Sequence, residues 1–118
     1  MQPGDHVQPE ITVDDFFKAD VRIGTVTRAE PFPEARKPAF KLWIDFGPLG
    51  ERKTSAQVTD HYTLEDLTGR RVLAVVNFPP RQIGPFRSEV LTLGVTDAQG
   101  RVSLLTVDRP APDGARMS

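Results

Sequence analysis

The feature that most restricts the fold is a pair of prolines, Pro79-Pro80, shortly after the longest purely apolar run of the chain, residues 72–76. A run that is apolar at every position predicts a strand whose two faces are both covered. Because proline has no backbone N–H, a sheet ladder cannot continue through this pair. The chain is therefore expected to leave the sheet at Asn77-Phe78, just before the prolines.

The rest of the hydrophobic pattern is mostly of strand type. Between positions 40 and 46 every second residue is a large apolar one, as a half-buried strand requires. Further strands are predicted over residues 21–26, 53–58, 71–78, 89–95 and 102–107. Short helices are predicted over residues 13–19, with Thr12 as N-cap, and over residues 64–67. Five or six short strands with one or two short helices are typical of an all-β Greek-key barrel, the OB-fold, with a small β-sandwich as the main alternative.

Length and composition fit one small domain. The chain has 118 residues, enough for a single hydrophobic core. Residues 1–12 are rich in proline and polar side chains and are predicted to be a flexible tail, so the domain is expected to span residues 13–118. There is no cysteine, which favours a reducing compartment. Because the sequence shows neither a signal-peptide pattern nor an apolar run of membrane-spanning length, we expect a cytoplasmic protein without membrane insertion.

Charge is distributed unevenly along the chain, although the formal net charge is only −1. Residues 1–20 hold five acidic residues and one lysine, whereas residues 67–88 hold four arginines and no acid. Residues 36–53 add five basic residues against two acidic ones. If the last two segments lie side by side they form a positive face; the alternative is an ordinary mixture of solvated charges. The small net charge argues against a dedicated DNA-binding protein.

Several hydrogen-bond donors are expected on the loop that follows the apolar strand. Amide, guanidinium and hydroxyl groups suited to phosphate or peptide carbonyl oxygens come from Asn77, Arg81, Arg87 and Ser88. A loop stiffened by two prolines presents such groups at little ordering cost. For Asn77 the alternative is that its amide satisfies backbone groups of the loop.

A second row of donors is expected along the second and third predicted strands and the loop before them. It consists of Arg36, Lys37, Lys41, Lys53, Ser55 and Gln57. Alternating donors on one strand face suit a groove that follows a polymer backbone. The alternative for Ser55 and Gln57 is an ordinary outward-facing strand position.

Trp43 lies on the strand face opposite the alternating apolar residues, so its indole is expected to point out of the barrel. Such a tryptophan is either buried in a dimer contact or under the N-terminal helix, or offered to an apolar side chain or a base of a ligand. The same alternatives apply to Phe78 and Phe86 in the loop. Phe16 and Phe17 are expected to pack the first helix on its own barrel or on a partner.

Catalytic and metal sites are not expected. His6 lies in the predicted tail, and His61 has no second histidine or cysteine with which to build a metal site. The acidic pairs Asp14-Asp15 and Glu65-Asp66 fit the first turns of the predicted helices. The sequence has no phosphate-binding glycine loop and no nucleophile elbow. It therefore predicts a protein that is not an enzyme and needs no cofactor or metal.

Four stretches carry a specific family resemblance. They are DVRIGTV at 20–26, FPEARKPAFKLWIDFG at 32–47, KTSAQVT at 53–59 and VVNFPPRQIGPFRSEVLTLG at 75–94. Together they closely resemble the CsaA family. More distantly, they are similar to the tRNA-binding domain that is appended to some methionyl-tRNA synthetases and found as free-standing dimers. Several separate motifs in the same order make a chance match improbable.

The resemblance implies an OB-fold barrel, a homodimer and two activities. The first is binding of unfolded or presecretory polypeptides as an export-related chaperone, and the alternative is binding of structured tRNA through a basic face of the barrel. The tRNA-binding relatives typically have Gly-Met where this chain has Val90-Leu91, and this departure favours the chaperone. The final segment, VDRPAPDGARMS, is expected to lie as an arm on the partner of a homodimer.

Overall fold

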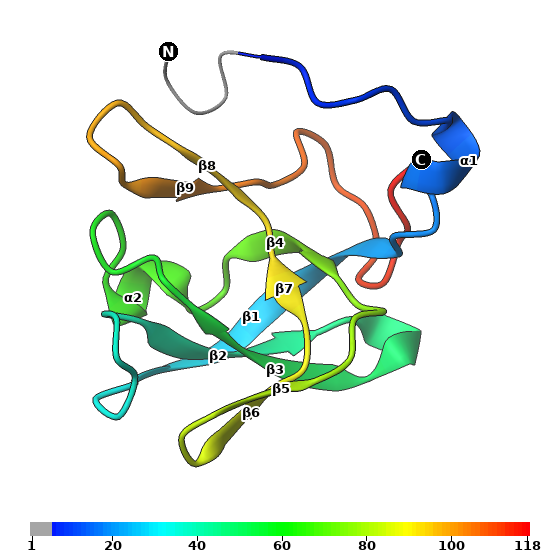
Figure 1. The fold of residues 1–118 in the computed structure, drawn as a ribbon. Coiled ribbons are helices and arrows are strands. Elements are labelled where there is room, and N and C mark those ends of the chain that lie inside the picture. Colours follow the sequence, from blue (N-terminus) through cyan, green and yellow to red (C-terminus); the bar gives the residue numbers. More distant parts are fainter. Residues whose placement is uncertain (1–5) are drawn as a thin grey trace.

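The structure, a computed structural model, describes residues 6–118 (Figure 1). In chain order the elements are α1 (Val13–Phe16), β1 (Val21–Pro31), β2 (Phe40–Asp45), the 3₁₀ helix η1 (Gly47–Leu49), β3 (Glu51–Ala56), α2 (Leu64–Leu67), β4 (Arg71–Val75), β5 (Arg81–Ile83), β6 (Phe86–Ser88), β7 (Leu91–Thr92), β8 (Gly94–Thr96) and β9 (Val102–Leu104). Residues 6–12 of the predicted tail contain no helix or strand. The rest of that prediction, residues 1–5, lies outside the described residues.

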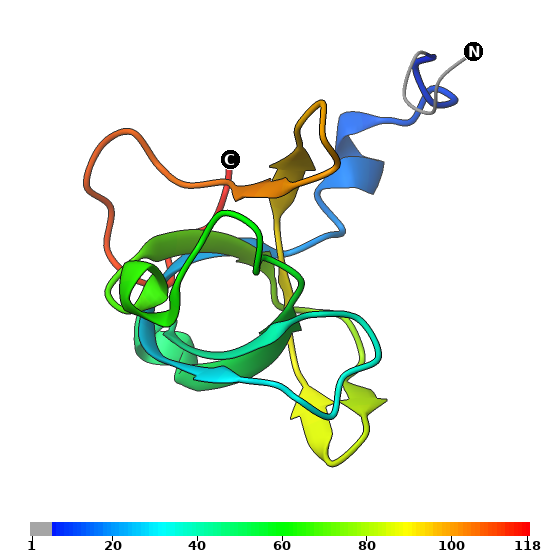
Figure 2. The same cartoon turned by 90° about the vertical axis from the view of Figure 1, so that its left-hand side faces the viewer.

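Five antiparallel strands roll into a nearly closed barrel in the order β3-β2-β1-β4-β7. The long strand β1 pairs with β4 through its first half and with β2 through its second half, and its register shifts between Val26 and Arg28. Such an irregularity bends a strand and helps a sheet to curl. The ring closes where the Glu89 backbone N–H donates to the Lys53 carbonyl at 2.8 Å. Figure 2 shows the ring of strands end-on, and the predicted OB-fold barrel is confirmed.

The core follows from the alternation in β2. Leu42, Ile44 and Phe46 have no exposed surface, whereas Trp43 between them is half-buried on the outer face. Gly24 of β1 lies against this apolar row. A Cβ at position 24 would lie 2.6 Å from Ile44 Cγ2 and 2.8 Å from the Phe46 ring. Only glycine therefore lets β1 come this close to the core without displacing these side chains.

Both short helices begin where the sequence predicts. The Thr12 hydroxyl accepts a hydrogen bond from the Asp15 N–H at 3.0 Å, and Thr63 and Asp66 form a reciprocal capping box at the start of α2. Helix α1 ends at Phe16, three residues earlier than expected. The Phe16 side chain is 47% exposed, so it is only partly packed within this chain.

The second half of the chain differs from the predicted pattern. Residues 81–88, expected as a loop, form the β5–β6 hairpin, and Gly84 in its turn has a positive φ of 55°. The strand predicted over residues 89–95 is split at Leu93. This residue donates to the Leu73 carbonyl of β4 at 2.9 Å and accepts from the Leu105 N–H at 3.0 Å. The chain therefore passes at Leu93 from the barrel into a separate β8–β9 hairpin.

The C-terminal segment, residues 107–118, runs along the start of β1 in its own chain. The Ile23 carbonyl accepts from the Gly114 N–H at 2.8 Å, and the Val21 carbonyl accepts from the Met117 N–H at 2.8 Å. This edge of β1 is available because β2 pairs only with the second half of the strand. The segment expected as an arm on a partner thus pairs with its own barrel. The homodimer itself stays a prediction, which light scattering of the purified chain tests.

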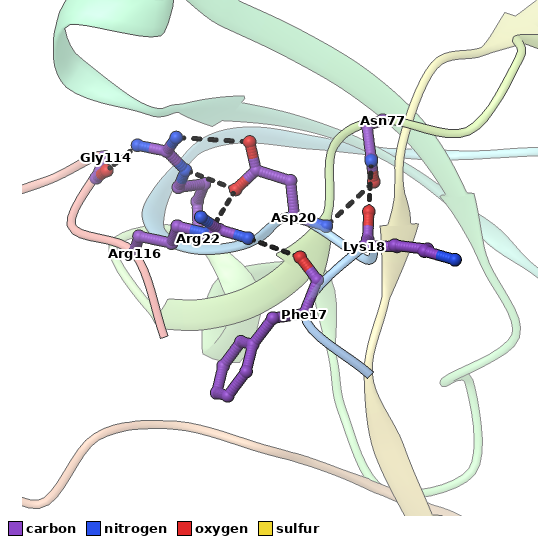
Figure 3. A network of polar contacts seen from close by, with 7 residues as sticks. All are labelled: Phe17, Lys18, Asp20, Arg22, Asn77, Gly114 and Arg116. Atoms are coloured by element: carbon purple, nitrogen blue, oxygen red, sulfur yellow. Dashed lines mark hydrogen bonds and ion pairs between the residues drawn. The ribbon is translucent and has the colours of Figure 1, made fainter. Parts of the chain in front are cut away.

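The Asp20 carboxylate connects the start of β1 to the C-terminal segment (Figure 3). Its carboxylate accepts hydrogen bonds from Arg22 Nε at 2.6 Å and Nη2 at 3.1 Å, and Arg116 Nε lies 3.4 Å away. Arg116 also donates to the Phe17 carbonyl at 2.6 Å, and Arg22 donates to the Gly114 carbonyl at 2.9 Å. The hydrogen bond from Arg22 lowers the pKa of Asp20 below the ordinary aspartate value, although partial burial acts in the opposite direction.

Acid is therefore expected to weaken the fold partly through Asp20. Because the pKa of this carboxyl is lower in the folded chain than in the unfolded one, its contribution to stability is present at neutral pH. The contribution is lost as the pH falls below about 4 and through the lowered pKa. We expect the free energy of unfolding, measured by urea titration, to decline from about pH 6 to about pH 3, and to decline less steeply in Asp20→Asn. The control is Asp14→Asn, which removes an exposed carboxylate that makes no ion pair within residues 6–118. An unchanged slope in Asp20→Asn would contradict this expectation.

Candidate ligand-binding site

A pocket of about 500 Å³ opens beside the end of β3. Its apolar lining comes from four segments that meet here and includes Val58, Ile83, Val90, Leu91, Val102 and Leu104. Phe78 and Leu91 are 50% and 49% exposed, while Val58 and Val90 are buried beneath them. A concave apolar surface with a few polar groups at its edge suits the capture of an apolar side chain.

Four of the predicted donors line this pocket: Ser55, Gln57, Arg81 and Ser88. Ser55 and Gln57 lie at the end of β3 and just beyond it, and Arg81 begins β5. Arg81 and Gln57 are exposed. Within residues 6–118, Arg81 makes no ion pair. Glu89 also lines the pocket, but its carboxylate accepts from the Lys53 N–H at 3.0 Å and forms no ion pair with Arg81.

The β5–β6 hairpin is fixed to the barrel by an aromatic cluster. The Phe86 ring lies edge-on to Phe32 and Trp43, with ring centroids 5.4 and 5.9 Å away. The ammonium groups of Lys41 and Lys53 lie 5.6 and 5.2 Å from the same ring. Contacts of this kind favour a cation near an aromatic face. The hairpin thus gathers two lysines of β2 and β3 around one buried phenylalanine.

Trp43 does point out of the barrel, but its own chain covers it. The guanidinium carbon of Arg28 lies 3.9 Å from the centre of the indole, and Phe86 contacts it edge-on. The N-terminal helix, one of the covers considered from the sequence, is not the cover in the structure. The reason is the β5–β6 hairpin, which folds over β2 and brings Phe86 to this position. Contact of Trp43 with a ligand stays a prediction.

The two phenylalanines of the predicted loop occupy different environments. Phe86 is only 6% exposed because it lies at the centre of the aromatic cluster. It therefore packs the hairpin against the barrel. Phe78 is half exposed and lines the pocket. Of the two, Phe78 is therefore the side chain that a ligand reaches directly.

Two of the predicted donors are used by the fold. The Asn77 Oδ1 accepts from the Asp20 N–H at 2.9 Å, and its Nδ2 donates to the Lys18 carbonyl at 2.7 Å. The Ser88 Oγ accepts from the Ser55 N–H at 3.0 Å, where β3 meets the strand that closes the barrel. The alternative considered for Asn77 is that its amide satisfies backbone groups of the loop that contains it. In the structure the amide satisfies backbone groups that precede β1. Direct ligand contacts by these side chains stay predictions.

The basic residues gather only in part. Arg36 lines a second, shallower pocket of about 370 Å³ together with Phe32 and Phe40, and Lys37 is exposed beside it. Arg87 is exposed on β6 and faces Gln82 of β5 across the hairpin.

Two other arginines of the basic segments are engaged elsewhere. Arg70 lies 4.9 Å from the Tyr62 ring centre, and Arg71 pairs with Asp113 at 3.0 Å. The positive face expected from the sequence is therefore reduced to the surroundings of the hairpin.

The apolar part of the pocket was missed by sequence reasoning. Ile83, Leu91, Val102 and Leu104 line it, but no local pattern places them together. One signal was available: Gly84-Pro85 is a turn sequence between Ile83 and Phe86, two residue types that favour strands. A turn at this point favours a hairpin, but it does not indicate that Phe86 is buried.

His61 lies outside the pocket, and its Nε2 atom is 2.8 Å from Asp97 Oδ2. No cluster of three or more His, Cys, Asp or Glu side chains within residues 6–118 is arranged to hold a metal ion. The same part of the chain contains no helix that is long and apolar enough to cross a membrane.

The barrel and its side hairpin identify the class of protein. Residues 21–116 match the family model described as a putative tRNA binding domain. The chain therefore belongs to the tRNA-binding-domain family.

Within this class the chain is similar to solved CsaA chaperones. The crystal structure of CsaA from Bacillus anthracis str. Ames is 49% identical with a TM-score of 0.88, covering 93% of this chain and all of that one. CsaA from Picrophilus torridus is 45% identical with a TM-score of 0.86, covering 92% of this chain and all of that one. The MetRS-related protein from Pyrococcus horikoshii is 30% identical with a TM-score of 0.83, covering 94% of this chain and all of that one. The predicted CsaA resemblance is confirmed.

The curated relatives that match are much longer proteins. Methionine–tRNA ligase 1 from Sorangium cellulosum is 38% identical over 109 residues, which is 92% of this chain but 15% of the ligase. Methionine–tRNA ligase from Porphyromonas gingivalis is 35% identical over 99 residues, or 84% of this chain and 14% of the ligase. The chain thus spans about a seventh of the length of these two ligases.

Proposed function

We propose that this chain is a CsaA-like chaperone that binds unfolded or presecretory polypeptides in the cytoplasm during protein export, without catalysing a reaction. The observation that carries the proposal is the 500 Å³ pocket, whose exposed apolar side chains lie next to an arginine without an ion pair in the described chain.

The chemistry of the pocket matches that of an unfolded chain. An unfolded polypeptide exposes apolar side chains together with backbone carbonyls that need hydrogen-bond donors. Phe78 and Leu91 supply apolar area for the side chain, and Arg81 at the edge supplies donors for a carbonyl or carboxylate oxygen. Proline at positions 79 and 80 limits the conformations of this wall, which reduces the ordering cost of binding.

The comparisons support the same function. Two CsaA chaperones align over their whole length at 45–49% identity. The Val90-Leu91 pair, from which the sequence predicts a chaperone rather than a tRNA-binding protein, lies in the lining of the pocket.

A second candidate function is tRNA binding. It is favoured by the cations around the β5–β6 hairpin: within residues 6–118, Lys41, Lys53 and Arg87 make no ion pair. Structured RNA is recognised largely through its backbone and shape, and such contacts require basic side chains. The description of the matching family points in the same direction.

One titration compares the two functions. A single preparation is titrated with a labelled, permanently unfolded polypeptide, reduced and carboxymethylated α-lactalbumin, and with labelled tRNA, each at about 50 and about 200 mM salt. Apolar capture predicts a polypeptide affinity that changes little with salt. If the protein neutralises about three phosphates of the tRNA on binding, the affinity for tRNA falls roughly 20- to 40-fold over the same range. Absence of polypeptide binding would contradict the chaperone proposal, and absence of both would contradict both functions.

A further inference from the structure

Asn77 continues the β1–β4 ladder with its side chain. The last residue pair of this ladder is Val21 with Val75, and the Val76 N–H then donates to the Asp20 carbonyl at 2.9 Å. One step further, the Asn77 amide accepts from the Asp20 N–H and donates to the Lys18 carbonyl. A primary amide carries the same donor and acceptor as a peptide group. The side chain thus extends the pairing at the point where the prolines end it (Figure 3).

We propose that Asn77 is a positioning residue for the pocket: its side-chain amide ties the wall formed by Phe78 and Pro79 to the start of β1. The inference rests on the proposed function, because it assigns a role in that pocket to a residue that does not line it.

The wall needs such an anchor. Pro79 and Pro80 have no N–H to donate, and no backbone hydrogen bond involving residues 78–80 occurs within the described chain. At its far end the segment enters β5, where Arg81 pairs with Ser88. At its near end, the two hydrogen bonds of the Asn77 amide are the last polar contacts before the wall begins.

The backbone segment to which Asn77 is hydrogen-bonded has further polar contacts of its own. The Asp20 carboxylate is bonded to Arg22 and lies against Arg116, and Arg116 in turn donates to the Phe17 carbonyl (Figure 3). The segment on both sides of Lys18 is thus connected to β1 and to the C-terminal segment. A contact to this frame restrains the wall more than a contact to a mobile tail would.

The test compares Asn77→Ala with Thr63→Ala. The first removes both amide hydrogen bonds. The second removes the Thr63 hydroxyl that accepts from the Asp66 N–H at 3.1 Å in the α2 cap, outside the pocket. The probe is the unfolded α-lactalbumin described above. If the wall is in place about a tenth of the time without its anchor, the apparent Kd rises about tenfold in Asn77→Ala, while Thr63→Ala stays close to the wild type.

Hydrogen exchange supplies a second readout that does not depend on the ligand. Amides of the β5–β6 hairpin are expected to exchange faster in Asn77→Ala than in the wild type or Thr63→Ala. Faster exchange with weaker binding supports the positioning role. Should Asn77→Ala not fold, Asn77→Asp keeps the acceptor for the Asp20 N–H, loses the donor to Lys18, and is expected to show both effects in weaker form.

The remaining outcomes overturn the inference. Unchanged exchange in the hairpin means that the wall does not depend on Asn77. Weaker binding with unchanged exchange assigns Asn77 a direct ligand contact instead. If the wild type binds no unfolded polypeptide, the proposed function fails, and the exchange comparison still decides whether Asn77 holds the wall.

Discussion

Leu91→Glu is expected to remove most of the polypeptide binding while the barrel stays folded. Leu91 lies in β7, lines the pocket and is already 49% exposed, so a charged side chain at this position remains hydrated in the free protein. A bound polypeptide covers the same position and would desolvate the carboxylate. Together with the lost apolar contact, this weakens binding by about 2 kcal/mol or more, which is about a 30-fold rise in Kd.

Val95→Glu is the matched control for this change. Val95 is 57% exposed in the neighbouring strand β8 and does not line the pocket. Both variants replace one exposed aliphatic side chain by a carboxylate. The change in net charge is therefore the same in the two proteins. Fluorescence anisotropy with the unfolded polypeptide measures both. Equal dissociation constants for the two variants would show that the pocket is not where the polypeptide binds.

Arg81→Glu is expected to remove most of the tRNA binding. Arg81 is exposed at the base of the hairpin, whose Phe86 has two lysines beside its ring. Replacing its positive charge by a negative one removes a phosphate contact and adds repulsion. We expect at least about a tenfold loss of affinity at about 50 mM salt, and a salt slope that is smaller by about one.

Arg109→Glu makes the same change of charge in the C-terminal segment. The Arg109 side chain is 91% exposed and lies only 3.7 Å from Asp108, in an ion pair that contributes little. If tRNA binds around the hairpin, this control keeps most of its affinity. Equal losses in both variants, measured by filter binding across salt concentrations, would mean that only the net charge matters.

The barrel could be predicted from local patterns because its causes are local. The alternation in β2 directly determines that Leu42 and Ile44 face the core and Trp43 faces outward. The pair Pro79-Pro80 interrupts strand pairing because neither residue has a backbone N–H to donate to a ladder. These predictions required no knowledge of which segments meet in space.

The site could be predicted only in part, because it depends on contacts between distant residues. Asn77 bonds to backbone groups 57 and 59 positions earlier in the sequence, and no local pattern indicates which groups it will reach. Leu91 and Val95 have the same character in the sequence, yet only Leu91 lines the pocket. The chain leaves the barrel at Leu93, between these two residues, so Leu91 lies in β7 of the barrel and Val95 in the separate β8–β9 hairpin.

NMR mapping of a bound polypeptide shows directly whether the polypeptide occupies the 500 Å³ pocket. The isotope-labelled chain is titrated with unfolded α-lactalbumin, and the shifts of its amide NMR signals are followed. If the polypeptide binds in the pocket, the largest shifts fall on the end of β3, on Phe78 to Ile83, and on Val90 to Gly94. Shifts confined to other surfaces, such as the second pocket around Arg36, with none in these segments, would contradict it.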